Sequence, residues 1–182
     1  MDRRQRKTRT AIFEAFTALL AEKSFSRITV GEIIARADIG RATFYAHFET
    51  KDDLLKALCS ELFDHILASA AGEKGKNHLF TCDAPASVFL HLMQHLQKND
   101  NHILDLLSGG NDELFAGYFK EALLDLVKDQ QALFAARKDP ALPESFWIDH
   151  IAAVFTQTVR WWVVSGKKES PEEICRYFYL SV

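Results

Sequence analysis

The chain has little proline and cysteine and no long apolar run. Four of its 182 residues are proline and three are cysteine. Scarce proline, together with the lack of sustained polar–apolar alternation, favours an all-helical fold. Because no run of about 18 uncharged apolar residues occurs, we expect no membrane span. The cysteines are odd in number and widely spaced, which predicts reduced thiols in a cytoplasmic protein (Cys59, Cys82 and Cys175).

Motifs of catalysis and cofactor binding are also missing. The sequence has no glycine-rich phosphate loop, no Gly-x-Ser-x-Gly turn and no His-Glu-x-x-His motif. His91 and His95 are four residues apart, a spacing that can chelate zinc but that also arises often by chance. We therefore expect no enzyme activity, no cofactor and no bound metal.

Positive charge is concentrated at the N-terminus. Residues 1–51 contain ten Lys or Arg and six Asp or Glu, while the remaining 131 residues contain twelve and nineteen. The first part therefore carries +4 and the second −7, an asymmetry that suits contact with phosphates. Ahead of the first expected helix, a basic arm is either a disordered, solubilising terminus or a contact with DNA (Arg3, Arg4, Arg6, Lys7 and Arg9).

Residues 29–54 have the layout of a DNA-reading helix-turn-helix. Thr29 and Glu32 have capping-box spacing at the start of a first short helix. Asp38 falls in the turn, where Asp tolerates the left-handed backbone region. A second short helix is expected over about 41–48, and a third, longer helix follows.

The second short helix has one apolar and one small, polar side. Phe44 and Phe48 are four residues apart and define the side that faces the core. Small residues on the opposite side leave the backbone free to approach a base-pair floor. This outer side carries Ala42, Thr43 and Ala46, flanked by Arg41, Tyr45 and His47. The alternative is a solvated helix face in an ordinary bundle.

The segment RATFYAHFETKDDLL, preceded by ITVGEIIARADI, resembles the DNA-binding signature of the TetR (tetracycline-repressor) family of bacterial transcription regulators. The similarity extends from about Arg9 to Leu62. It implies an all-α protein of about nine helices, with a three-helix DNA-binding domain over residues 1–50. An all-helical dimerisation and effector domain would then occupy residues 51–182.

The resemblance also implies roles for single residues. Thr43, Tyr45 and His47 would contact the DNA backbone, and Lys51 would grip a phosphate. We choose Arg41 for a base-edge contact. The full set of expected DNA-binding residues is Thr29, Arg41, Ala42, Thr43, Tyr45, His47 and Lys51. One departure is the turn Ala37-Asp38-Ile39-Gly40, where the family commonly has Ala-Gly-Val-Ser, so the capping serine side chain is missing.

The spacing of apolar residues and the positions of helix-breaking residues predict the remaining helices. The pattern over 112–137 is apolar nearly all round, which predicts a helix through the centre of the C-terminal domain. A loop is expected over 72–84, where glycines break the helical pattern. The other expected helices cover residues 8–22, 50–71, 85–97, 102–107, 145–164 and 171 to the last residues.

The last two helices are rich in large aromatic residues. We expect a self-complementary two-fold interface there, in which each protomer contributes both helices to a four-helix bundle. The candidate interface residues are Trp161, Trp162, Tyr177 and Phe178. The family uses the same place for dimerisation. The alternative is that these side chains belong to the core of one protomer.

The resemblance further implies an effector pocket between the C-terminal helices. Its candidate lining, each member of which is equally explained as plain core, is His91, Met93, His95, Phe115, Tyr118, Phe119 and Trp147. The leading hypothesis is a homodimeric repressor of a palindromic operator, released by an effector. The alternatives are an activator or repressor controlled by a protein partner, without a small-molecule pocket, and a helical partner-binding module.

Overall fold

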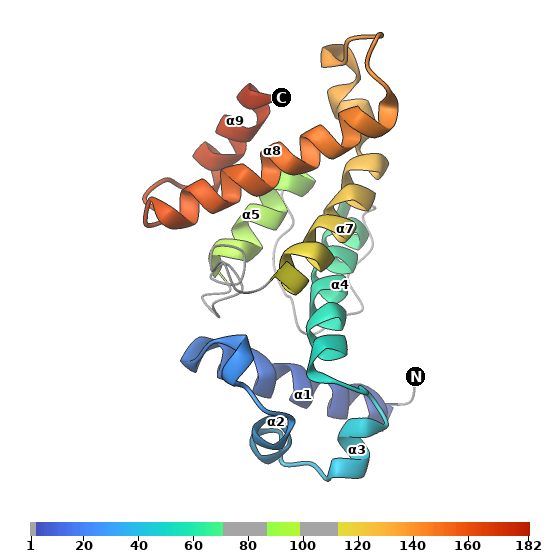
Figure 1. Cartoon of the computed structure of the whole chain (residues 1–182), viewed down its shortest axis with the longest axis vertical. Coiled ribbons are helices and arrows are strands. Elements are labelled where there is room, and N and C mark those ends of the chain that lie inside the picture. The colour runs from blue at the N-terminus through green and yellow to red at the C-terminus, as the bar shows by residue number, and fades with distance from the viewer. Residues whose placement is uncertain (1–2, 71–86, 99–112) are drawn as a thin grey trace.

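The computed structural model of the chain describes residues 3–70, 87–98 and 113–182 (Figure 1). These residues form eight α-helices and two 3-10 helices, with no strand among them. The all-α fold class is therefore confirmed. No helix of the described ranges is long and apolar enough to cross a membrane. The helix expected over 102–107 and the loop expected over 72–84 lie outside the described residues.

The N-terminal part is a three-helix unit, drawn in blue at the bottom of Figure 1. Its elements are α1 (Arg3–Glu22), the 3-10 helix η1 (Phe25–Arg27), α2 (Val30–Arg36) and α3 (Arg41–Tyr45). α1 packs against α2, and α2 packs against α3. The three helices share one core, in which Phe13, Ile33 and Phe44 are fully buried. We call this unit, residues 3–48, the head.

Local signals fix the helix-turn-helix. The Thr29 hydroxyl oxygen accepts a hydrogen bond from the Glu32 backbone N–H at 3.3 Å, and the Glu32 carboxylate accepts one from the Thr29 backbone N–H at 2.9 Å. This reciprocal pair is the capping box that the spacing predicts. Asp38 has a φ of 51°, in the left-handed region expected of the turn. α3 ends at Tyr45 rather than at Phe48, and the chain continues as a turn.

α1 begins at Arg3, five residues before the expected start at Thr8. The expectation of a separate basic arm is therefore wrong, because Arg3, Arg4, Arg6 and Lys7 belong to the first turns of this helix. Arg, Gln and Lys have good helix propensity, and no proline or glycine interrupts the segment.

α4 (Lys51–Ala70) carries the chain from the head into the rest of the molecule (Figure 1). Thr50 caps it, because its hydroxyl oxygen accepts a hydrogen bond from the Asp53 backbone N–H at 3.0 Å. α4 packs against both α5 (Val88–Lys98) and α7 (Glu113–Asp129). We call the described residues from Lys51 onward the body.

α7 is shorter than the helix expected over 112–137. It ends at Asp129, and the 3-10 helix η2 (Gln131–Arg137) follows. η2 places the fully buried Phe134 ring against Phe89 and Phe178, at centroid distances of 5.6 and 5.9 Å. This packing ends the α-helix at Asp129, although the residues of the segment have good α-helix propensity.

α8 (Glu144–Val164) and α9 (Pro171–Ser181) complete the body. Trp162 and Phe178 are fully buried inside the protomer, and the Trp162 indole N–H donates to the Glu169 carbonyl oxygen at 2.9 Å. Their assignment to a dimer interface is therefore wrong, since both side chains fill the core of a single protomer.

Candidate nucleic-acid interface

α3 exposes small and polar side chains to solvent on one side and buries an aromatic side chain on the other. Arg41, Ala42 and Thr43 are exposed, while Phe44 is fully buried. The Tyr45 ring packs edge-on against Phe44 at 5.5 Å and is still 52 % exposed, so its hydroxyl is accessible. The outer side of α3 is thus open, as DNA contact requires.

A groove of about 550 Å³ separates α3 from the first turns of α1. Its lining is Arg4, Gln5, Thr8, Ala42, Thr43, Ala46 and His47. The concave surface brings a guanidinium, hydroxyl groups and an imidazole together, all of which bond phosphate oxygens. Gln5 and Thr8 are candidate contacts that the sequence pattern missed, because only the helical start of α1 places them opposite α3.

Arg9 has a different role from the other N-terminal basic residues. Its guanidinium bonds the Glu61 carboxylate of α4 at 3.2 Å and lies 5.0 Å from the ring centroids of both Phe13 and Phe48. It therefore links the head to α4 and does not belong to a DNA-contacting arm.

Lys51 contacts backbone carbonyl groups of the head. Its ammonium donates to the carbonyl oxygens of Phe25 and Ile28, each at 3.0 Å, and lies 4.5 Å from the centre of the Phe25 ring. These contacts fix the start of α4 against the segment before α2. The phosphate contact expected of Lys51 stays a prediction.

Thr29 and Glu32 form a charged cap at the start of α2. The Thr29 hydroxyl donates to the Glu32 carboxylate at 2.9 Å, and Lys23 forms an ion pair with the same carboxylate. The Lys23 ammonium, followed by the hydrogen bonds from Thr29, lowers the pKa of Glu32 to about 2. The Thr29 hydroxyl thus takes part in the cap, and the DNA contact expected of Thr29 stays a prediction.

Comparison with known proteins decides the family. A model of bacterial regulatory proteins of the tetR family matches residues 12–58, and a model of transcriptional regulator C-terminal regions matches residues 83–181. A TetR transcriptional regulator from Streptococcus agalactiae 2603V is 31% identical, with a TM-score of 0.71 over 100% of this chain and 96% of that chain. The chain belongs to the TetR family. Regulators of this family bind DNA and are typically dimers.

Two further proteins are similar to this chain. The uncharacterized HTH-type transcriptional regulator YxbF of Bacillus subtilis (strain 168) is 40% identical over 79 residues, which are 40% of this TetR-family chain. The match spans 21% of that relative's length. A putative TetR-family regulator from Syntrophomonas wolfei str. Goettingen, 22% identical, shares the fold with a TM-score of 0.68 over 94% of this chain and 90% of that chain.

The residues expected to line an effector pocket of this TetR-family protein lie on α5, α7 and α8. Met93, Phe115 and Phe119 are buried in the hydrophobic core. Tyr118 borders a groove of about 250 Å³ between α4 and α7. On α8, the Trp147 ring stacks on that of His150, with the ring centroids 5.6 Å apart. His91 and His95 are also buried, and their Nε2 atoms are 3.1 Å apart. A shared effector pocket for these residues stays a prediction.

A third histidine joins this pair. His65 of α4 lies with its ring centre 5.1 Å from that of His91 and 4.8 Å from that of His95. Among the described residues these three form a group that is able to hold a metal ion. The sequence pattern missed His65 because it is 26 residues away from His91, so only the packing of α4 on α5 brings them together.

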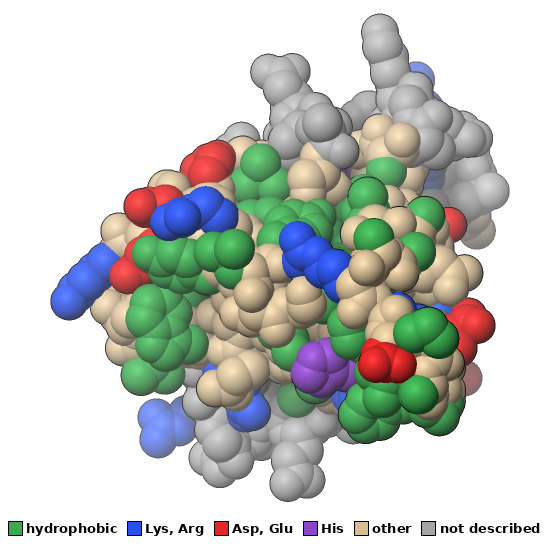
Figure 2. Space-filling view, turned by 90° about the horizontal axis from the view of Figure 1, so that it is seen from above, with side chains coloured by type: hydrophobic (Ala, Val, Ile, Leu, Met, Phe, Trp, Pro, Cys, Tyr) green, Lys and Arg blue, Asp and Glu red, His purple; other side chains and the backbone are tan. Residues whose placement is uncertain are grey.

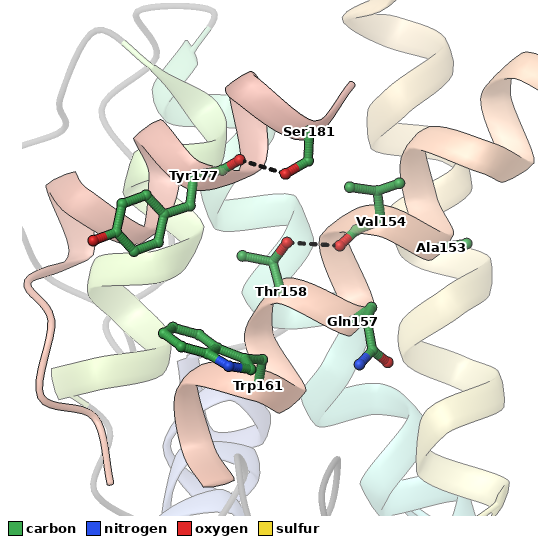
Figure 3. A pocket seen from close by; sticks show the side chains of 7 residues that line it. All are labelled: Ala153, Val154, Gln157, Thr158, Trp161, Tyr177 and Ser181. Carbon is green, nitrogen blue, oxygen red and sulfur yellow. Dashed lines mark hydrogen bonds between the residues drawn. The ribbon is translucent and has the colours of Figure 1, made fainter. Parts of the chain in front are cut away.

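The surface formed by α8 and α9 carries exposed apolar side chains. A groove of about 620 Å³ is lined there by Ala153, Val154, Gln157, Thr158, Trp161, Tyr177 and Ser181. In Figure 3 the Trp161 and Tyr177 rings lie on the same side of this groove, one from each helix. Trp161 is 47 % exposed. Hydrophobic patches are also visible on the end of the molecule opposite the head (Figure 2).

Proposed function

We propose that this TetR-family regulator is a homodimeric repressor that binds a palindromic operator through α3 and the first turns of α1. The observation that carries the proposal is the groove between these helices, in which Arg4 faces the small residues of α3. Phosphate contacts along the groove would orient α3, and Arg41 would read a base edge in the major groove.

Binding of a labelled random-sequence duplex, measured by fluorescence anisotropy across a salt series, tests the DNA-binding face. We expect binding at low salt that collapses as salt rises. Arg4→Ala is expected to weaken binding to all DNA sequences alike and to reduce the slope of log affinity against log salt concentration by about 1. Lys128→Ala, which removes an exposed positive charge of α7, is the control. An unchanged slope for Arg4→Ala would remove the groove from the interface.

The proposed dimer forms through the α8–α9 surface. Trp161, Val164 and Leu180 are 47 %, 81 % and 72 % exposed, although all three are large and apolar. A two-fold pairing of this surface would bury them and would present two copies of α3 to two half-sites, about one DNA turn or a multiple of it apart.

Sedimentation of Trp161→Glu tests the dimer, because a buried charge would oppose association. Phe146→Glu, at the other end of α8 and 56 % exposed, is the control. We expect folded monomers from Trp161→Glu and dimers from Phe146→Glu. Dimers of normal affinity from both variants would contradict this interface.

Regulation by an effector in the body completes the proposal, and we infer that the protein has no catalytic role. Because its operator would be bacterial DNA, we also infer a cytoplasmic location. The alternatives are control by a protein partner, with activation or repression as the outcome, and a helical partner-binding module. A transcription assay on the selected operator separates activation from repression, and failure to bind any duplex at low salt would favour the partner-binding module.

A further inference from the structure

Three buried histidines meet where α4 packs against α5. His65, His91 and His95 are only 6 %, 2 % and 4 % exposed. His91 and His95 lie one turn apart on α5, with ring centres 4.8 Å apart. One nitrogen of each ring can be chosen so that all three nitrogens lie within 4.8 Å of one another.

This spacing is close to that of a metal site. Tetrahedral zinc with Zn–N bonds of about 2.0–2.1 Å places its ligand nitrogens about 3.3 Å apart. The Nε2 atoms of His91 and His95 are already at 3.1 Å. Bringing the longest separation of 4.8 Å to this value needs a shift of about 1.5 Å.

The ligand atoms of the cluster decide which cations fit. All three are imidazole nitrogens, which bind a metal in the neutral form. A set of nitrogen ligands favours zinc, copper, nickel or iron, whereas magnesium and calcium prefer oxygen.

Packing alone is a poor explanation for three imidazoles at this place. Ile66 beside His65 and Leu92 beside His91 are fully buried, so the cluster lies within an apolar layer. The hydrogen bond between the Nε2 atoms of His91 and His95 offsets part of the cost of burying polar rings, but leucine or phenylalanine would fill the same volume without that cost. A metal ion would supply a specific reason for these three side chains.

We propose that His65, His91 and His95 bind a divalent transition metal ion of the zinc class, which fastens α4 to α5. Three imidazoles leave a coordination position for water or a further ligand. The ion is the effector of the regulator, a role that rests on the proposed function.

α4 provides the connection from the metal site to the head. Glu61, one turn before His65, pairs with Arg9 of α1, and Lys51 bonds the carbonyl groups of Phe25 and Ile28. An ion that holds His65 against α5 therefore restrains the helix to which the head is attached. It alters DNA affinity to the extent that it binds the two head orientations unequally.

Titration of the untagged, chelator-treated full chain with ZnCl₂ in a calorimeter tests binding without DNA. We expect one ion per protomer. His65→Gln, His91→Gln and His95→Gln are each expected to lower the affinity at least about 100-fold, since even partners of metal ligands are worth about 10–100-fold. His150→Gln, which removes a histidine of α8, is the matched control and should bind as the parent does. Equal affinities in all five proteins, or no saturable binding, would overturn the metal site.

Imidazole ¹⁵N NMR of the unsubstituted protein covers the case in which a glutamine variant does not fold. The chain has seven histidines, and we expect one equivalent of Zn²⁺ to shift the ring signals of the three cluster residues. Shifts of His47 and His150 without shifts of the cluster would overturn the assignment.

DNA affinity measured with and without Zn²⁺ separates this inference from the proposed function. We expect the ion to change the affinity of the parent protein by at least about 5-fold and that of His91→Gln by less than about 2-fold. A protein that binds Zn²⁺ but no duplex keeps the metal site and loses the proposed function. A protein that binds duplex but no Zn²⁺ keeps the proposed function and loses the metal site. Binding of both, with no effect of Zn²⁺ on DNA affinity, overturns the effector role.

Discussion

The head and the body of this protein place their polar side chains in opposite ways. In the head, Arg41 and Thr43 lie outside a core that contains Phe44, while in the body His65 and His91 lie inside the core. The body instead exposes apolar side chains such as Trp161. The head thus offers the polar surface that the proposed DNA contact needs, and the body offers buried imidazoles for the proposed metal ion and an apolar surface for the proposed second protomer. α4 belongs to the body and bonds the head through Glu61 and Lys51, so it connects the two regions.

The adjacent tryptophans of α8 give the largest expected effect and test this contrast within the body. Trp162→Ala should lower the free energy of unfolding by about 3–5 kcal/mol, because it empties a fully buried site and removes the partner of the Glu169 carbonyl group. Urea denaturation at several protein concentrations should show this loss at every concentration.

Trp161→Ala is the matched control for Trp162→Ala. At concentrations where protomers are separate we expect Trp161→Ala to change the free energy of unfolding by no more than about 0.5 kcal/mol, since the Trp161 side chain is on the surface. At higher concentrations the loss of stability should grow, because the parent protein gains stability from dimer formation. Equal losses of stability in the two variants at all concentrations would mean that Trp161 and Trp162 do not differ in their burial within the protomer.

Arg41 tests whether the exposed side of the head reads sequence. Selection of binding sites from a random duplex pool should show relaxed preference at one position per half-site for Arg41→Ala, with a cost of about 1–3 kcal/mol. Arg36→Ala is the control, because the Arg36 guanidinium is held by Glu22 at 2.6 Å. If Arg41→Ala selected the same sequence as its parent, the base-reading role would be wrong.

Lys51 lies at the junction between the two regions, where a structural and a DNA-binding role predict different results. Lys51→Met should lower the free energy of unfolding by about 1–2 kcal/mol, through the lost bonds to the Phe25 and Ile28 carbonyl groups. The salt dependence of DNA binding should stay unchanged, in contrast to Arg4→Ala. A salt slope reduced by about 1, with stability unchanged, would favour the phosphate contact that the family resemblance implies.

The head was largely predictable because its signals are local. The Thr29–Glu32 capping box, the left-handed Asp38 and the buried Phe44 and Phe48 all follow from spacings of a few residues. The start of α1 was missed because the basic run before Thr8 fits a disordered arm as well as it fits a helix, and the groove that depends on this start was missed in turn.

The body was less predictable because its decisive contacts join distant segments. A helical wheel places Trp161 and Trp162 on different surfaces, but only the packing of α8 decides which one is buried. The end of α7 depends on the position that Phe134 takes between Phe89 and Phe178. His65 likewise acquires its meaning from α5 and not from its own neighbours on α4.

The pH dependence of the head gives the smallest expected effect. The pKa of Glu32 is lowered from 4.5 to about 2 in the folded state by Lys23 and Thr29. A lowered carboxyl pKa stabilises the fold fully above the unfolded pKa and loses this contribution as pH falls through the folded pKa. The difference in Tm between the parent and Glu32→Gln should therefore be constant above about pH 4.5 and disappear near pH 2. Circular dichroism melts over this range provide the measurement, with the exposed Glu14→Gln as control. A difference that persists unchanged to pH 2 would show that the charge of Glu32 does not stabilise the cap of α2, and that the local signals of the head act through hydrogen bonding alone.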